Sequence, residues 1–347
     1  MSGIKSGKTD DLFGSCKKAK KASIRHIAVK MLVVLLMSAL MFSTVGCSAV
    51  EKPLETGTAG VSGADAFRQY YLQKAAADAE HDYSHMYLEG LEDMTSETVG
   101  TVVDTEELTI EVRGAIISGC RAEVILRITA NQLDSVLCDD GKSVPNNFRF
   151  GDETYSFMHK YNFDSLSYRY YYSDEDDSLA PNQFELHYWI AQEPFDQDNY
   201  AIELTDFGCY SAGGFSPLYT GNWMVDISFV PVSDTSRTID IGQEVTVGGH
   251  KFILENIRIS PLACSVNLVC QEDEDYVKEH FGEILGVFSD ESKNCALTLA
   301  DGTELGSKQF SNEYSTHDDF RFFITFFGPM AVDDIVSLSL YGTEFSI

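Results

Sequence analysis

The stretch LTIEVRGAIISGCRAEVILRIT, residues 108–129, decides the fold class of this chain. Apolar and polar residues alternate over residues 108–113 and again over 123–129, which is the period of a strand with one buried face. Ser118-Gly119 lies between the two runs and is a turn signal. The stretch therefore predicts an antiparallel hairpin with one face in a hydrophobic core and the other in solvent.

Further runs with strand composition follow the hairpin, separated by turn residues. They predict strands at residues 154–158, 167–172, 184–190, 200–209 and 222–230. Short strands at this spacing are typical of an antiparallel β-sandwich. Residues 95–231 are therefore predicted to form an immunoglobulin-like β domain, although no Cys-Trp-Cys arrangement of the antibody kind is present.

A second β series begins after the polar connector PVSDTS, residues 231–236. Its run RFFITFF, residues 321–327, is almost wholly apolar, as a central strand should be. Other strands are expected at residues 238–241, 244–247, 250–259, 265–270, 285–289, 296–299, 335–341 and 344–347, with a short helix at 274–281. Residues 237–347 are accordingly predicted to form a second β-sandwich domain. The whole chain is expected to be mainly β.

Helical periodicity replaces alternation upstream of residue 95. Phe67, Tyr70, Tyr71 and Lys74 share one face, so residues 63–94 are predicted to be a helical segment with Ser62 as its N-cap. Before it, residues 48–62, SAVEKPLETGTAGVS, are small and turn-prone, which predicts a flexible tether.

The uncharged run MLVVLLMSALMFSTVGC, residues 31–47, divides the chain by charge. Residues 1–30 carry eight Lys or Arg and two acidic residues, whereas residues 48–347 carry 17 basic and 52 acidic residues. Basic residues next to an apolar segment stay on the cytoplasmic side of a membrane. The pattern predicts a basic cytoplasmic leader, a signal or membrane anchor, and β domains on the extracytoplasmic face of the cell membrane.

Two modes of membrane attachment are compatible with this segment. The end STVGCS resembles a bacterial lipobox, which would make Cys47 the lipidation site, although Thr44 replaces the usual Leu. Alternatively, the 17 residues act as an uncleaved single-pass anchor, somewhat shorter than the roughly 20 residues that a spanning helix needs. Both alternatives place the β domains on the same side.

Composition restricts the class of protein further. Hydrophobic residues make up 44% and charged residues 23% of the chain, which is typical of a globular protein. A pI near 4.4, with no clustered Lys or Arg after residue 47, argues against nucleic acid as a partner. The six later cysteines, at 120, 138, 209, 264, 270 and 295, permit three disulfides, but we favour buried free thiols.

Three segments carry a resemblance to a known family. They are the hairpin at 108–129, GNWMVDISFVPV at 221–232, and VGGHKFILENIRISPLACSVNLVC at 247–270. Together with the basic leader and apolar segment, they resemble uncharacterised membrane-attached ectodomains of Gram-positive bacteria. That family pairs an immunoglobulin-like domain of unknown function with a second β domain whose hallmark resembles Ile259-Ser260-Pro261. Some relatives occur beside extracytoplasmic-function sigma factors, which implies a sensing or anti-sigma role. The leader here holds one Cys and one His, too few for the zinc module of many anti-sigma factors.

Catalytic and metal signatures are weak in this sequence. There is no G-x-S-x-G elbow, and the histidines after residue 85 are scattered singly. His81 and His85 lie four residues apart, and Asp174 to Asp177 are four consecutive acids, but we interpret both as solvated groups rather than metal ligands. We expect no enzyme activity, no cofactor and no metal.

Aromatic residues supply the ligand-binding candidates. Eight Tyr or Phe lie within residues 155–172, and Tyr188-Trp189 follow on the next strand. Tyr170, Tyr171 and Trp189 are the candidates for a binding surface, although alternation sends Tyr170 and Tyr171 to opposite faces and favours a core role for much of the cluster. The sequence predicts a membrane-attached extracytoplasmic sensor or binding module with an unknown protein or glycan partner. A carbohydrate-binding protein and a cell-wall hydrolase are the alternatives.

Overall fold

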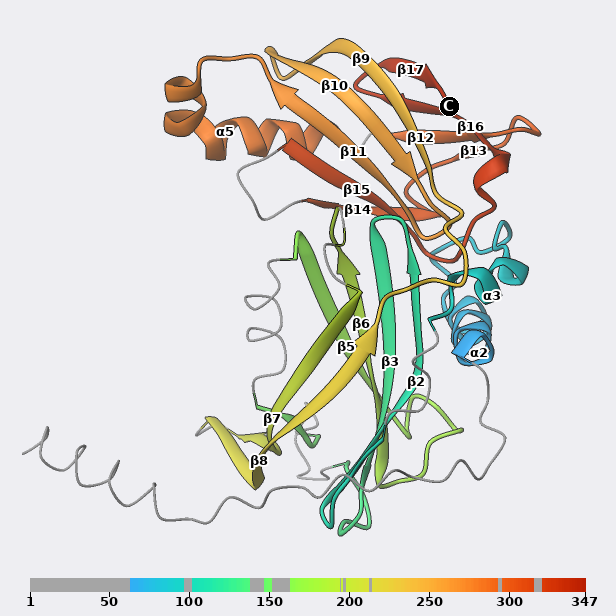
Figure 1. The fold of residues 1–347 in the computed structure, drawn as a ribbon, viewed down its shortest axis with the longest axis vertical. Coiled ribbons are helices and arrows are strands. Elements are labelled where there is room, and N and C mark those ends of the chain that lie inside the picture. The colour runs from blue at the N-terminus through green and yellow to red at the C-terminus, as the bar shows by residue number, and fades with distance from the viewer. Residues whose placement is uncertain are drawn as a thin grey trace, which may run out of the picture. The chain divides into compact units, whose positions relative to one another are not determined.

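The computed structural model describes residues 63–96, 102–137, 147–151, 163–193, 195, 198–211, 214–292, 295–314 and 320–347. These residues belong to one compact unit, Ala59–Ile347, and fold mainly as antiparallel β-sheets (Figure 1). The predicted leader, the segment 31–47 and the tether at 48–62 lie outside the described residues. Within the described ranges, no helix has the length and hydropathy of a membrane span.

The first β region consists of two sheets. Sheet I has the order β1-β2-β3-β6-β5, and sheet II has the order β4-β7-β8. The strands of sheet I are β1 Val102–Asp104, β2 Leu108–Ser118, β3 Arg121–Ala130, β5 Ser165–Tyr172 and β6 Gln183–Ala191. Those of sheet II are β4 Arg149–Phe150, β7 Asn199–Ser211 and β8 Gly214–Ser228. Buried side chains of both sheets form one hydrophobic cluster, as the alternation in β7 and β8 requires.

The hairpin that decides the fold class is formed by β2 and β3. Gly119, in the turn, has φ of 61°, a left-handed conformation that glycine adopts at little cost. The register runs from Ser118 opposite Arg121 to Leu108 opposite Ala130, with a bulge between Val112 and Gly114. The expectation of a single buried face is wrong: β3 is buried on both faces along its first six residues, because a helix covers the second face.

The second β region also has two sheets. Sheet III has the order β14-β15-β11-β10-β9, and sheet IV has the order β13-β12-β16-β17. Sheet III contains β9 Arg237–Val247, β10 His250–Ile259, β11 Ala263–Cys270, β14 Phe310–Tyr314 and β15 Phe320–Phe326. Sheet IV contains β12 Ala296–Leu299, β13 Glu304–Leu305, β16 Ile335–Leu340, which follows the short 3-10 helix η3 Val332–Asp334, and β17 Thr343–Ser346. A second apolar cluster, which includes Phe322, Ile324 and Phe326 of the RFFITFF run, lies among these strands.

Helices cover parts of both regions. α2 spans Gly63–Ala77, η2 spans Leu88–Gly90, α3 spans Leu91–Met94 and α5 spans Glu274–Ser292. The helical segment predicted at 63–94 is thus interrupted after residue 77 and becomes helical again at 88–94. Asp78 follows α2, and its carboxylate accepts hydrogen bonds from the backbone N–H groups of Glu80 and His81, which stabilises a turn there instead of another helical turn.

Several predicted elements differ from the structure. The strand expected at 285–289 is wrong, because those residues continue α5, whose Ile284 is buried in the second cluster. The strands expected at 238–241 and 244–247 are one strand, β9. The strand expected at 154–158 lies outside the described residues. The immunoglobulin-like assignment and the domain boundary at 231–237 stay predictions.

Candidate functional site

The two faces of sheet I differ in chemistry. Along β3 and β6, alternate residues point to a hydrophobic core face, which we define by Val124, Leu126, Ile128, Phe184, Leu186 and Tyr188. The intervening residues form what we call the helix face, defined by Glu123, Ile125, Arg127, Glu185, His187 and Trp189. The strand register places Glu123 opposite Trp189, Ile125 opposite His187 and Arg127 opposite Glu185. Three charged side chains and an imidazole therefore lie side by side on one face.

Helix α2 covers this face and packs closely against β2. Phe67 and Tyr71 are almost fully buried there, in a cluster with Ile116 and Ile125. The approach depends on Gly114, because a Cβ at that position would lie 2.9 Å from Phe67 Cε2 and 3.0 Å from the carbonyl oxygen of Gly63. Tyr71 extends further and donates a hydrogen bond of 2.8 Å to buried Glu123.

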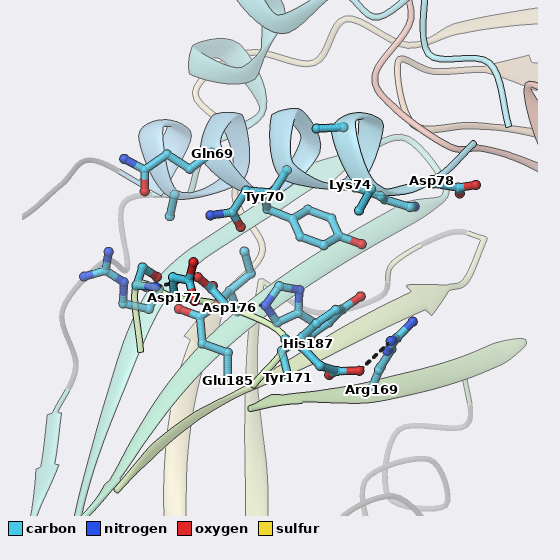
Figure 2. Close-up of a pocket in the computed structure, with 18 of the residues that line it drawn as sticks. Gln69, Tyr70, Lys74, Asp78, Arg169, Tyr171, Asp176, Asp177, Glu185 and His187 are labelled. Carbon is cyan, nitrogen blue, oxygen red and sulfur yellow. Dashed lines mark hydrogen bonds and ion pairs between the residues drawn. The ribbon is translucent and has the colours of Figure 1, made fainter. Parts of the chain in front are cut away.

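A cleft of about 1150 Å³ lies between α2 and the turn that joins β5 to β6. Figure 2 shows Gln69, Tyr70 and Lys74 on the helix side, with Tyr171, Glu185 and His187 below them. Asp176 and Asp177, from the turn, lie on the opposite side of His187 from Arg169. Four basic and seven acidic residues line the cleft, so its surroundings are acidic overall. We call it the α2 cleft.

The floor of the α2 cleft contains a hydrogen-bonded group of three charged or titratable side chains. Arg127 donates from Nε and from a terminal nitrogen to Glu185 Oε1, at 3.1 and 2.8 Å. His187 Nε2 lies 2.9 Å from Glu185 Oε2. Burial opposes ionisation of Glu185, but His187 and Arg127 outweigh it, so the pKa of Glu185 is lowered. Ionised Glu185 accepts hydrogen bonds, so Nε2 of His187 is the protonated nitrogen.

Two tyrosines enclose the imidazole of His187. The ring centroids of Tyr70 and Tyr171 lie 4.7 and 4.6 Å from that of His187. The Arg169 guanidinium lies over the Tyr171 ring at 4.8 Å and pairs with Glu175 at 3.1 Å. The Tyr70 hydroxyl is buried and has no partner within hydrogen-bond geometry. Burial, followed by the effect of Tyr171, raises the pKa of Tyr70 well above its ordinary value.

Lys74 has an unusual environment for a lysine. Its ammonium lies 5.7 Å from the ring centroid of Tyr70, 5.8 Å from that of Tyr83 and 5.6 Å from that of Phe327. It donates one long hydrogen bond, 3.4 Å, to the backbone oxygen of Phe327. Among the residues that the structure describes, no carboxylate lies within ion-pair distance of it. Burial lowers the pKa of Lys74, although Glu123 partly offsets the effect.

The proposed ligand-binding aromatics are not gathered in one place. Tyr171 lines the α2 cleft. Tyr170 lies on the core side of β5, where it stacks on Tyr172 with ring planes 11° apart and accepts a hydrogen bond from the backbone N–H of Phe150. Trp189 packs in the cluster beneath α2 and does not line the cleft. The expected separation of Tyr170 from Tyr171 is confirmed, and the three do not form a flat patch.

The acidic and histidine candidates for metal binding have other roles. Asp174 to Asp177 lie on the rim of the cleft, where Glu175 pairs with Arg169 and Asp176 accepts from the backbone N–H of Ser178. His81 and His85 do not share a helical face, since α2 ends before them. His81 instead lies 2.6 Å from Asp78. In the described part of the chain, no group of His, Cys, Asp or Glu has the arrangement of a metal site.

Cys120, Cys209, Cys264 and Cys270 are free thiols. Cys120, Cys264 and Cys295 are buried, and Cys209 and Cys270 are partly buried. Burial raises the pKa of Cys120 and Cys264, so these thiols are poor nucleophiles. The prediction of buried, unpaired cysteines is confirmed for Cys120 and Cys264, whereas Cys209 and Cys270 are unpaired but only partly buried. Cys47 and Cys138 lie outside the described residues.

Sequence analysis missed the polar floor of the cleft. Arg127, Glu185 and His187 occupy alternate positions of predicted strands, but which of them meet depends on strand register. One feature of the sequence did point to it. Charged residues occur at alternate positions of otherwise apolar strands, so that they lie on the same face of the sheet: Glu123 and Arg127 in β3 and Glu185 in β6. Lys74 lay on the predicted helical face, with no sign that Phe327 would approach it.

Comparison with known proteins gives little further information. No family model matches the sequence, and no curated protein matches it significantly. Among solved structures, the chain is similar to one described as the conserved domain protein from Bacillus anthracis. The two share 10% sequence identity and a TM-score of 0.42 over 75% of this chain and 80% of that chain. A likeness at this level carries no conclusion about function.

Proposed function

We propose that this chain is a non-enzymatic, membrane-attached binding module on the extracytoplasmic face of a bacterial cell envelope, and that the α2 cleft is its ligand site. The observation that carries the proposal is the content of the cleft: the buried Glu185–His187 pair, a partly buried ammonium with no ion-pair partner, and a buried phenol with no hydrogen bond of standard geometry. Such groups are costly to bury and are uncommon where packing alone is needed. They are concentrated at functional sites.

The membrane location rests on the sequence. The uncharged residues 31–47 follow a basic leader, and the resemblance to Gram-positive ectodomains implies the same topology and a sensing role. Lipidation of Cys47 and an uncleaved anchor both display the β regions at the membrane surface. Mass spectrometry of the mature N-terminus distinguishes them, since an intact Met1 excludes lipidation of Cys47.

The cleft geometry favours binding over hydrolysis. A hydrolase would need an accessible base beside a nucleophile. His187 and Glu185 do form a hydrogen-bonded pair, but the His187 side chain is only 4% exposed and lies between two tyrosine rings. Of the described residues that line the cleft, Ser178 alone carries an aliphatic hydroxyl, and it is on the β5–β6 turn.

The geometry also disfavours a sugar held mainly by stacking. A sugar ring needs an open aromatic face. The ring of Tyr171 is instead in contact with His187 and Arg169, and Tyr170 and Trp189 lie elsewhere. Hydrogen bonds and charge are therefore the main means of recognition that the cleft offers.

Blocking the cleft tests the proposal directly. Ala76 lines the cleft on an exposed part of α2, and Leu72 is an exposed residue of the same helix outside the cleft lining. We expect Ala76→Trp to abolish the binding of cell-envelope amino acids, peptides or glycans in a calorimetric screen, while Leu72→Trp retains it. Equal binding by both variants would place the site elsewhere. Release of a cleaved product would support the hydrolase alternative instead.

A further inference from the structure

Lys74 offers hydrogen-bond donors that the protein itself does not use. An ammonium has three N–H donors, and the structure gives Lys74 one long bond, to the carbonyl of Phe327. The three aromatic rings around it attract the positive charge but accept no ordinary hydrogen bond. A partly buried lysine without an ion-pair partner loses hydration of its charge, and a bound anion would offset that cost.

Further donors surround the same place. The hydroxyl of Tyr70, a residue only 8% exposed, makes no hydrogen bond of standard geometry within the described residues, and its only hydrogen-bonding interaction there is a weak one with the Tyr171 hydroxyl. Tyr171 lies against it, with ring centroids 6.2 Å apart, and Arg169 lies over Tyr171. Figure 2 shows Tyr70 and Lys74 descending from α2 toward Tyr171, with Arg169 beyond. Two cations and two phenols therefore face the same end of the cleft, where Glu175 already pairs with Arg169 and Asp78 lies within electrostatic range of Lys74.

We propose that the α2 cleft binds a small organic molecule through a single carboxylate, which pairs with Lys74 and accepts hydrogen bonds from the phenols of Tyr70 and Tyr171. This inference rests on the proposed function and names its ligand class. The exposed side chains of Ala76 and Ala77 offer apolar surface for the rest of the molecule.

A carboxylate fits this end of the cleft better than a phosphate does. Phosphate sites usually depend on bidentate arginine or backbone N–H groups. Here Arg169 is already paired with Glu175, and the remaining donors are one ammonium and two hydroxyls. The acidic turn at 174–177 repels a dianion about twice as strongly as a monoanion, because the Coulomb energy is proportional to the charge of the ligand. The cleft therefore selects for one negative charge.

The experiment compares acids with their uncharged amides. Acetate, phenylacetate, benzoate and succinate are each titrated into the full-length wild-type protein, and each acid is compared with its matching amide. Binding is followed by NMR chemical shifts and calorimetry. At least one acid is expected to bind while its amide does not. Failure of every acid at millimolar concentration, equal binding of acid and amide, or binding of inorganic phosphate alone would overturn the carboxylate assignment.

A substitution at Lys74 tests the named residue. Lys74→Met keeps most of the length of the side chain and an apolar stem beside the rings but removes the charge. It should weaken acid binding by about tenfold or more, equal to about 1.4 kcal/mol, and leave the melting temperature unchanged or higher. Lys278→Met removes a charge from exposed α5 and should have no effect on binding. Lys74→Gln serves as a second variant. Unchanged affinity in the Lys74 variants would overturn the role of Lys74.

The result also separates this inference from the proposed function. If uncharged ligands bind and Ala76→Trp blocks them, the cleft is a ligand site and only the carboxylate class is wrong. If acids bind equally well to Ala76→Trp, the cleft is not the site, and both proposals fail.

Discussion

The core face and the helix face of sheet I are built from neighbouring residues of the same strands, yet they are covered in different ways. The core face meets sheet II with aliphatic and aromatic side chains, and Leu126, Phe184 and Leu186 are completely buried there. The helix face meets α2 with charged and polar groups, and the α2 cleft remains beside the helix. The difference indicates that the core face mainly supplies stability, whereas the helix face supplies the chemistry of the site.

Burying the charged groups of the helix face costs desolvation free energy, and hydrogen bonds within the protein offset part of that cost. Glu123 accepts hydrogen bonds from Tyr71 and Arg121, and Glu185 accepts from Arg127 and His187. These bonds offset much of the cost of removing the charges from water. Lys74 and the Tyr70 hydroxyl are less well satisfied, and both residues line the cleft.

The largest effect is expected on the core face. Leu186→Ala removes a completely buried side chain from the cluster between the sheets, and we expect it to lower the free energy of unfolding by about 2–5 kcal/mol. Chemical denaturation measures the change. Ile125→Ala, on the helix face beside the cleft, should cost less, because α2 and the cleft can adjust around it. Equal costs would show that both faces are packed alike.

A smaller effect is expected from the charged floor. Glu185→Gln leaves Arg127 and His187 without their anionic partner, and should cost about 1–3 kcal/mol at neutral pH. Because the pKa of Glu185 is lowered in the folded protein, ionised Glu185 contributes to stability at pH values above its ordinary pKa of 4.5. The contribution is lost as the pH falls through the lower folded value.

The pH dependence provides the control. Denaturation of both proteins at neutral pH and at successively lower pH below 4.5 should show the difference between wild type and Glu185→Gln becoming smaller. Glu304→Gln, at an exposed position of β13, should leave stability unchanged throughout. A difference for Glu185→Gln that stays constant with pH would mean that the charge of Glu185 is not what stabilises the floor.

Local patterns predicted most of the strands but failed where the pattern was ambiguous. The strand at 250–259 was predicted with its observed bounds, because its alternation ends at a Gly-Gly turn and at Pro261. The run at 285–289 is too short and apolar for periodicity to separate a strand from a helix. Only its contacts decide, since Ile284 and Phe281 of α5 pack into the second core.

The site depends on contacts that no local pattern contains. Alternation correctly placed Tyr171 apart from Tyr170, because both lie in one strand. The pairing of Arg127 with Glu185 joins strands 58 residues apart, and the contact of Lys74 with Phe327 joins segments 253 residues apart. The spacing of residues along the chain does not predict which residues of such distant segments lie opposite each other. The candidate site therefore became visible only when α2, β3 and β6 were placed together.

The smallest effect is expected at the margin of the cleft, where Asp78 ends α2. The hydrogen bond from His81, opposed in part by burial and assisted by Tyr83, lowers the pKa of Asp78 to about 2. The contribution of Asp78 to stability is therefore present above its ordinary pKa of 3.8 and is lost as the pH falls toward 2.

Asp78→Asn keeps an oxygen for the backbone N–H groups of Glu80 and His81 but removes the charge. Melting temperatures should differ slightly above pH 3.8 and converge below it, by less than for Glu185→Gln, because Asp78 is more exposed to water. An effect as large as that of Glu185→Gln would show that charge at the margin of the cleft matters as much as charge on its floor, and would remove the distinction between them.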